Sequence, residues 1–146
     1  MESSNETGSE ILKGLNVHHI GYLVKRLKRS EEAFARLGYT VEREVCYDHV
    51  RDVNISFMKN GEYRVELIEP AGKTSPLYPL LKNYKNSPYH ICYTVEDLEA
   101  SKRELENDGF MVIQDTQVAP ALDGRNVVFM VSADIGIIEL VEEAGK

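Results

Sequence analysis

The sequence lacks a long apolar run, has only two cysteines and carries no excess of basic residues. No segment reaches the roughly 18 consecutive apolar residues that a membrane-spanning helix needs, so a membrane span is excluded and we expect a soluble globular protein. The opening MESSNETGSEILKG has no apolar core of a secretion signal, and we expect a cytoplasmic protein. Cys46 and Cys92 are too few for a disulfide framework, so we expect both thiols to be reduced.

Acidic residues outnumber basic ones by 24 to 17, and the net charge is −7. The Lys and Arg residues are scattered and form no basic stripe of the kind that neutralises nucleic-acid phosphates, so we expect no nucleic-acid partner. A small anionic ligand is compatible with this charge, because a local cluster of Arg can act inside an acidic protein.

The 146 residues are enough for one compact domain but not for two ordinary ones. The start of the chain is polar and rich in small residues, which predicts a disordered or loosely attached tail over residues 1–15. A single domain is then expected over residues 16–146.

One part of the chain is repeated. HIGYLV at residues 19–24 returns as HICYTV at residues 90–95, 71 residues later, and the agreement continues through helical patterns that end at Gly38 and Gly109. Two hairpin patterns follow, VNISFMKNGEYRVELIEP around an Asn-Gly turn and RNVVFMVSADIGIIELVEE around SADIG. The sequence therefore predicts an α+β protein of two tandem βαβββ modules, residues 16–70 and 88–143. Residues 71–87 are the expected linker, with a short helical piece.

Strand alternation places one histidine and one glutamate of each copy on the same side of its sheet. The alternate apolar residues of HIGYLV face the helix, so His19 faces away from it, and the same parity applies to His90. Glu66 and Glu139 lie between apolar neighbours in the last strand of each copy and also face away from the helix. Two imidazoles and two carboxylates suit a divalent transition ion with positions left for water or substrate, and not a closed, thiolate-rich structural zinc site.

A structural interpretation competes with this one. A single histidine on a strand is more often a hydrogen-bonded structural residue, and a single glutamate near a strand end is more often solvated. The match between the two halves favours a shared site. His18 and Glu69 are the rival ligands, but they have the opposite strand parity, and Tyr89 stands where the second copy would repeat His18.

Four motifs of the repeat, VHHIGYLV, VELIEP, SPYHICYTV and GIIELVE, resemble those of the vicinal oxygen chelate superfamily. That superfamily includes glyoxalase I, methylmalonyl-CoA epimerase, extradiol dioxygenases and bleomycin or fosfomycin resistance proteins. The resemblance implies a cupped, incomplete β-barrel, a homodimer and one divalent metal ion, with Ni, Co or Zn as the expected ions. The metal ligands that it implies are His19, Glu66, His90 and Glu139.

The ligand set is similar to that of bacterial glyoxalase I. This similarity implies a lyase or isomerase that converts a methylglyoxal–thiol hemithioacetal into a lactoyl thioester by proton transfer through a metal-bound enediolate. Glu139 is the expected base and Glu66 the carboxylate that stays on the metal, although the pseudo-symmetry makes these catalytic roles exchangeable. The alternative is a methylmalonyl-CoA epimerase acting on a CoA adduct. A second alternative is a non-catalytic small-molecule-binding or resistance protein of the same fold.

The run VELIEPAGKTSPLYPLLKN followed by PYHICYTVEDLE also resembles methylmalonyl-CoA epimerases. That family has a catalytic glutamate just before the third strand, and this sequence has Val50 there. Asp48 or His49 would substitute for it only if the loop were shifted.

Four residues are candidates for binding the remote end of the substrate. Arg51 and Arg125 precede the corresponding strands VNISF and NVVFM, and Arg side chains bind carboxylates or phosphates well. A surface position explains both arginines equally well. Tyr47 and His49 are further candidates for the same entrance.

Overall fold

The computed structural model describes residues 15–144, so residues 1–14 of the predicted tail lie outside the described part of the chain. The elements follow the order β1 (Asn16–Leu23), α2 (Leu27–Arg36), β2 (Thr40–Asp48), β3 (Val53–Asn60), β4 (Tyr63–Pro70), η2 (Tyr78–Leu80), α3 (Leu81–Tyr84), β5 (Ser87–Val95), α4 (Leu98–Asn107), β6 (Met111–Ala119), η3 (Pro120–Leu122), β7 (Arg125–Ser132) and β8 (Gly136–Glu142). This order contains both predicted βαβββ series, and the short helices η2 and α3 lie in the segment predicted as a linker.

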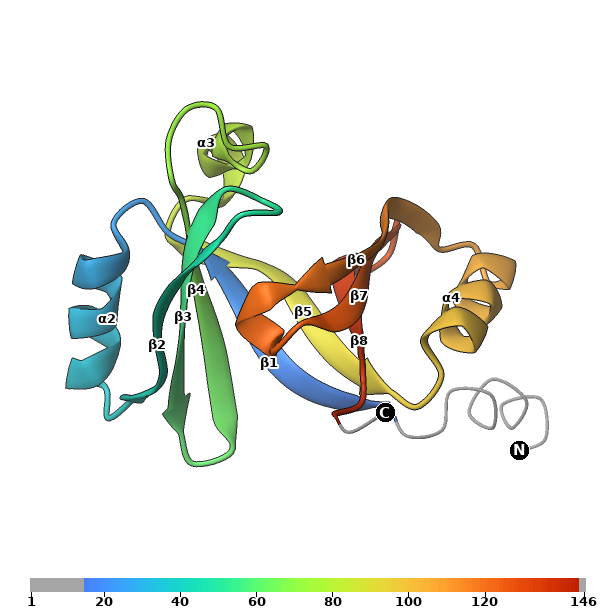
Figure 1. The fold of residues 1–146 in the computed structure, drawn as a ribbon, viewed down its shortest axis with the longest axis horizontal. Helices are drawn as coiled ribbons and strands as arrows, with labels where there is room; N and C mark the ends of the chain where they lie inside the picture. Colours follow the sequence, from blue (N-terminus) through green and yellow to red (C-terminus); the bar gives the residue numbers. More distant parts are fainter. Residues whose placement is uncertain (1–14, 145–146) are drawn as a thin grey trace. The chain divides into compact units, whose positions relative to one another are not determined.

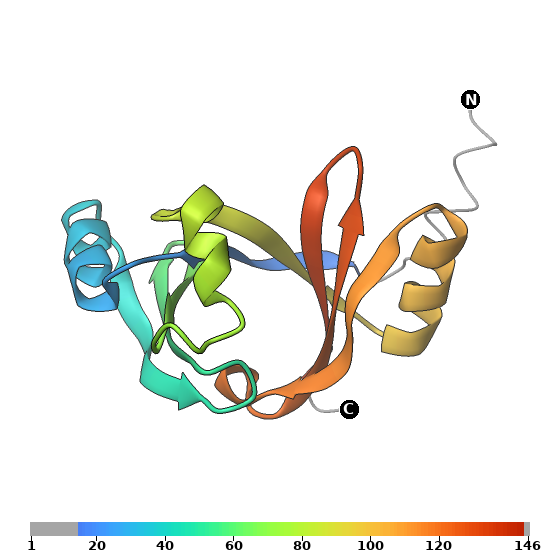
Figure 2. The ribbon, with the colours of Figure 1, turned by 90° about the horizontal axis from the view of Figure 1, so that it is seen from above.

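The described chain divides into two compact units. The N-terminal unit comprises residues 19–91 and 119–124, and the C-terminal unit comprises residues 15–18, 92–118 and 125–144. Hydrogen-bonded strands follow the order β2-β3-β4-β1-β5 in the N-terminal unit (Figure 1) and β1-β5-β8-β7-β6 in the C-terminal unit (Figure 2). Strands β1 and β5 contribute to both units. The predicted α+β class with two βαβββ series is confirmed.

The N-terminal unit buries one apolar face of its strands under α2. Strands β1 and β4 are parallel, with Tyr22 opposite Leu67 in register. The buried residues of this face are Val24, Leu27, Met58, Val65 and Leu67, and Tyr22, Phe34 and Tyr39 pack against them. Phe34 of α2 makes T-shaped ring contacts with Tyr22 and Tyr39, at centroid distances of 5.1 and 5.0 Å. The predicted parity is confirmed here, because the apolar alternate residues of β1 and β4 do lie under the helix.

The C-terminal unit repeats this arrangement under α4. Its buried cluster consists of Val95, Leu98, Leu105, Val128, Met130, Ile138 and Leu140, with Leu15, Tyr93, Phe110 and Val112 packed against it. Ile138 and Leu140 flank Glu139 on β8, so the Glu139 side chain points to the opposite face of that strand.

Both long helices end close to the predicted glycines. Gly38 and Gly109 have φ angles of +95° and +98°, which are left-handed conformations that a residue without Cβ adopts readily. Leu37 continues the apolar spacing of the first helical pattern in the sequence, but it lies after the last residue of α2 and is 69% exposed. The apolar face of this helix therefore ends before Leu37, because α2 ends at Arg36.

The first hairpin differs by one residue from the prediction. Asn60 pairs with Tyr63, so the two-residue loop is Gly61–Glu62 and not Asn60–Gly61. Gly61 takes the first loop position with φ +62°, which suits glycine. In the second hairpin Ser132 pairs with Gly136, so the predicted SADIG turn is confirmed.

No helix within residues 15–144 is both long enough and apolar enough to cross a membrane. Cys46 and Cys92, the two cysteines of the described residues, form no disulfide bond.

The two long helices are capped at their N-termini in different ways. Asp97 precedes α4, and its Oδ1 accepts a hydrogen bond from the backbone N–H of Ala100 at 3.0 Å. Arg26 precedes α2 without a side-chain cap, and Glu69 of β4 accepts the hydrogen bond from the backbone N–H of Leu27 at 3.0 Å instead. Helix α4 therefore depends on a local cap, whereas α2 depends on a carboxylate from a distant strand.

We expect Asp97→Ala to lower the free energy of unfolding by about 1 kcal/mol, because the Ala100 N–H then loses its acceptor. Urea unfolding followed by circular dichroism measures the change. Asp97→Asn is the matched control, since an asparagine oxygen also caps a helix, and it should stay near the original stability. Equal stability of the alanine and asparagine variants would show that the cap contributes nothing.

Candidate functional site

Three buried polar side chains converge within the N-terminal unit. His19 on β1, Glu66 on β4 and His90 on β5 are 1%, 5% and 3% exposed. Glu66 Oε1 lies 2.9 Å from His19 Nε2 and 3.5 Å from His90 Nε2. The two Nε2 atoms are 3.3 Å apart. One oxygen and two nitrogen atoms that could bind a metal ion therefore lie within 3.5 Å of one another.

Strand register explains why these three residues meet. Strands β1 and β4 pair with Gly21 opposite Glu66, so Glu66 lies two residues along from His19 on the neighbouring strand. On the other side of β4, Phe57 of β3 stands opposite Glu66. The Phe57 ring contacts the His19 ring edge-on at a centroid distance of 5.2 Å, and the Tyr89 ring contacts the His90 ring at 4.6 Å. Aromatic side chains thus hold both imidazoles in place.

Gly21 provides the space that the His90 imidazole occupies. A Cβ atom at residue 21 would overlap the ring and would lie 2.6 Å from both His90 Nδ1 and Nε2. The glycine of HIGYLV is therefore required by close approach of a side chain and not by a turn. The second copy has Cys92 at this position, which shows that the two copies are not interchangeable in detail.

The geometry of the three donors fits a divalent transition ion. Ligand atoms about 2.1 Å from a shared ion lie roughly 3.0 to 3.4 Å from one another in octahedral or tetrahedral coordination. The separations of 2.9, 3.3 and 3.5 Å in the N-terminal unit are close to those edges. Two imidazoles and a carboxylate are also the donor types that such ions take in open, reactive sites. The residues present therefore fit the metal that the sequence predicted.

The fourth predicted ligand, Glu139, belongs to the C-terminal unit. It lies on β8, is 3% exposed and stands opposite Phe129 of β7. The pair Glu139–Phe129 repeats the pair Glu66–Phe57, so both copies place a phenylalanine across from the buried carboxylate. The sequence analysis missed the two phenylalanines. They could have been found, because they are separated by 72 residues, nearly the spacing of the histidines.

The rival glutamate has a structural role. Glu69 accepts hydrogen bonds from the Leu27 backbone N–H and, at 3.1 Å, from the Asn54 side chain. Its counterpart Glu142 accepts a hydrogen bond from the backbone N–H of Asn126 at 2.8 Å. Both carboxylates bind backbone donors at element ends, which supports the choice of Glu66 as the ligand.

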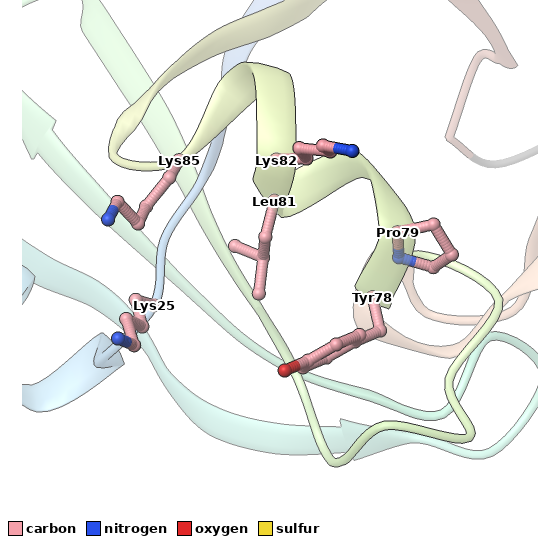
Figure 3. A pocket seen from close by; sticks show the side chains of 6 residues that line it. All are labelled: Lys25, Tyr78, Pro79, Leu81, Lys82 and Lys85. Carbon is pink, nitrogen blue, oxygen red and sulfur yellow. The ribbon is translucent and has the colours of Figure 1, made fainter.

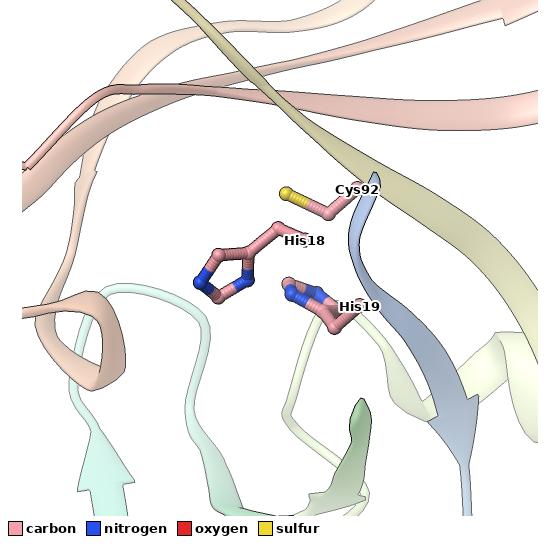
Figure 4. Close-up of side chains that lie close together, drawn as sticks. All are labelled: His18, His19 and Cys92. Atoms are coloured by element: carbon pink, nitrogen blue, oxygen red, sulfur yellow. The ribbon is translucent and has the colours of Figure 1, made fainter. Parts of the chain in front are cut away.

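The rival histidine has a cysteine neighbour. Within the C-terminal unit, His18 and Cys92 have ligand atoms less than 4.8 Å apart, and Figure 4 draws them together with the adjacent His19. His18 and Cys92 together offer one nitrogen and one sulfur ligand atom, whereas a structural zinc site has four protein ligands. Strand parity alone did not predict this proximity.

The predicted substrate-binding residues have different surroundings. Arg51 is buried, and its Nη1 forms an ion pair with Asp48 Oδ2 at 2.8 Å. The other carboxylate oxygen of Asp48 accepts hydrogen bonds from the backbone N–H groups of Val50 and Arg51. Asp48 therefore stabilises the turn between β2 and β3, and both of its oxygens are engaged. This makes it a poor replacement for a catalytic glutamate.

Tyr47, His49 and Arg125 are more accessible than Arg51. Tyr47 is exposed and donates a hydrogen bond to Asp52 Oδ1 at 2.5 Å, which raises the pKa of the phenol. His49 is exposed in the turn after β2. Arg125 Nη1 donates to the Glu142 carbonyl oxygen at 3.2 Å in the C-terminal unit. Their roles in substrate binding stay predictions.

Residues 18–129 match the Glyoxalase/Bleomycin resistance protein/Dioxygenase superfamily. The chain belongs to this superfamily. The matched segment begins in β1 and ends in β7, so it contains His19, Glu66 and His90 and stops before Glu139. The resemblance noted in the motifs is confirmed.

Several members of the superfamily are similar along nearly their whole length. An ethylmalonyl-CoA/methylmalonyl-CoA epimerase of Cereibacter sphaeroides is 31% identical over 132 residues, which cover 85% of this chain and 95% of that protein. A hypothetical protein of Bacillus halodurans has a solved structure with a TM-score of 0.80 and 25% identity, over 92% of this chain and 98% of that one. A methylmalonyl-CoA epimerase of Streptomyces coelicolor in complex with 2-nitronate-propionyl-CoA has a TM-score of 0.76 and 21% identity, over 89% and 95%.

These similarities confirm the vicinal oxygen chelate fold. They also confirm the prediction of an enzyme, because that prediction included an epimerase. They support the alternative of an epimerase better than the glyoxalase interpretation, which has no support beyond the superfamily. The homodimer stays a prediction.

We expect Gly21→Ala to displace the His90 imidazole, because the added methyl group overlaps the ring. The metal content of the purified variant should then be at least tenfold lower than that of the unchanged protein. Metal per chain, measured by mass spectrometry after dialysis, gives the readout, and far-UV circular dichroism checks the fold. Gly72→Ala is the matched control, since nothing lies within 4 Å of a Cβ atom there. Full metal occupancy in a folded Gly21→Ala protein would contradict the role given to His90.

Proposed function

We propose that the chain is a metal-dependent epimerase of a methylmalonyl-CoA-type thioester. The observation that carries this proposal is the 31% identity to the ethylmalonyl-CoA/methylmalonyl-CoA epimerase, over 95% of that protein's length. The buried cluster of His19, Glu66 and His90 supports it, because these residues would hold the metal. When bound, the ion supplies Lewis-acid stabilisation of the negative charge that develops on the substrate oxygens.

The reaction removes a proton from the carbon between the thioester carbonyl and the carboxylate. That carbon is acidic once the charge left on the oxygens is stabilised. We assign the removal of this proton to Glu139, whose burial and cross-strand phenylalanine match those of Glu66 in the other copy. Solvent water then returns a proton to the opposite face of the carbon, and Glu139 releases its own proton to solvent. In this assignment Glu66 keeps its place beside the two imidazoles as a metal ligand.

A second candidate function is the glyoxalase-type isomerisation. Epimerisation needs the proton to return to the opposite face of the carbon, which calls for a proton carrier on each face. Val50 stands where epimerases have a catalytic glutamate, and both oxygens of the nearby Asp48 are already bound. Isomerisation between two adjacent carbons needs only one proton carrier. The presence of Val50 in place of a second carboxylate therefore favours isomerisation.

The two functions are separated by turnover of purified, metal-loaded protein in deuterated water. We expect one epimer of methylmalonyl-CoA to yield both epimers with deuterium at the α-carbon. The hemithioacetal of methylglyoxal and glutathione should yield no lactoyl thioester. His19→Ala should abolish both turnover and metal binding, whereas the neighbouring His18→Ala should keep both. Formation of lactoyl thioester without deuterium exchange into methylmalonyl-CoA would overturn the proposal in favour of the second candidate.

Glu139→Gln tests the assignment of the base. We expect kcat to fall by about 100-fold or more while metal content stays unchanged, because the amide cannot accept the proton. Glu142→Gln is the matched control, since its amide oxygen can still accept the Asn126 N–H hydrogen bond, and its kcat should be unaffected. A Glu139→Gln protein with full turnover would remove Glu139 from the mechanism.

A further inference from the structure

A pocket lies in the N-terminal unit, around the short helices that follow β4. Its volume is about 390 Å³, and it is lined by Lys25, Tyr78, Pro79, Leu81, Lys82 and Lys85. Figure 3 shows Leu81 and Tyr78 between the extended side chains of Lys25 and Lys85 on one side and Lys82 on the other. The lining therefore combines three ammonium groups with an aromatic ring and two apolar side chains.

The positive charge of this pocket is uncompensated. Within residues 15–144, no carboxylate forms an ion pair with Lys25, Lys82 or Lys85, although lysines elsewhere pair with Glu31, Glu42 and Asp115. The whole chain carries a net charge of −7. The charge of the three unpaired lysines around this cavity is therefore opposite in sign to the net charge of the protein. An ammonium cluster of this kind attracts an anion with several negative charges.

The backbone holds two of the lysines in fixed relation to each other. Asn86 follows Lys85 in a left-handed conformation, with φ +58°. Its backbone N–H donates to the Leu23 carbonyl oxygen at 2.7 Å, and its side-chain oxygen accepts from the Lys25 N–H at 3.1 Å. These two hydrogen bonds join the segment after β1 to the segment after α3. They therefore hold Lys25 and Lys85 beside the same pocket.

We propose that this pocket binds the phosphate-bearing nucleotide end of coenzyme A, an identification that rests on the proposed function. The diphosphate and the 3′-phosphate would meet the ammonium groups of Lys25, Lys82 and Lys85. The adenine ring would pack on Tyr78 and the neighbouring apolar side chains, since aromatic and apolar surfaces stack with bases. Lys82 and Lys85 lie between the two copies, and Lys25 lies in the first copy, where the second copy has Glu96 at the corresponding position.

The position along the chain suits a ligand that also reaches the metal centre. Lys25 follows His19 by six residues, and Lys85 precedes His90 by five. Fully extended chain of that length spans no more than roughly 20 Å. The flexible pantetheine arm of coenzyme A separates its thioester from its phosphates, so one molecule can occupy both places.

The binding of adenosine 3′,5′-bisphosphate, the nucleotide fragment itself, tests the pocket without any turnover. We expect Lys25→Gln/Lys85→Gln to weaken this binding about tenfold or more in calorimetry, since two charge-assisted contacts are lost. Lys28→Gln/Lys73→Gln is the matched control, because it makes the same charge change at exposed lysines outside the pocket. In turnover, the pocket variant should raise KM for methylmalonyl-CoA about tenfold at unchanged kcat and leave methylmalonyl-pantetheine unaffected.

Equal bisphosphate binding by the pocket variant and its control would overturn the inference, whether or not the protein is an epimerase. Inorganic phosphate that binds as tightly as the bisphosphate would also overturn it, because the site would then recognise a simple anion. If neither thioester is turned over while bisphosphate binding still depends on the lysines, the proposed reaction falls and the nucleotide site stands.

Discussion

The burial of a carboxylate between two imidazoles constrains the rest of the N-terminal unit. Glu66, His19 and His90 have been removed from water, which is unfavourable unless a proton or a cation balances the cluster. Three strands must be in register to bring the ligand atoms within 3.5 Å of one another. The apolar residues of alternate parity then have to lie under α2, because a shift by one residue would exchange the two faces.

The duplicated and the unduplicated parts of the chain supply different functions. The repeat provides the proposed ligand residues, since each copy brings a strand histidine and a buried glutamate faced by a phenylalanine. Most residues that line the lysine pocket lie in the segment between the copies, and Lys25 comes from the first copy at a position where the second copy has Glu96. Members of a superfamily with one fold can therefore keep the same reactive centre and recognise different substrates through such junctions.

Periodicity in the sequence was enough to predict the two modules, the faces of β1 and β4, and the glycines after both long helices. These features depend on local alternation or on backbone conformation, which short stretches of sequence specify. The roles of Glu69 and Asp48 were not predictable, because a capping bond to Leu27 and an ion pair to Arg51 arise from tertiary position. The lysine pocket was hidden for the same reason: Lys25 lies 57 residues before Lys82 in the sequence.

The short segment 119–124, from the last residue of β6 to the residue before β7, belongs to the N-terminal unit. Asp123 forms an ion pair with Arg43 of β2 at 2.7 Å, and Ala121 and Leu122 are buried. A gene fragment that stopped after the first copy would lose this segment and expose the apolar surface beneath it. The two copies are thus not two separate stretches of chain, because residues from the second copy complete the unit that contains the first.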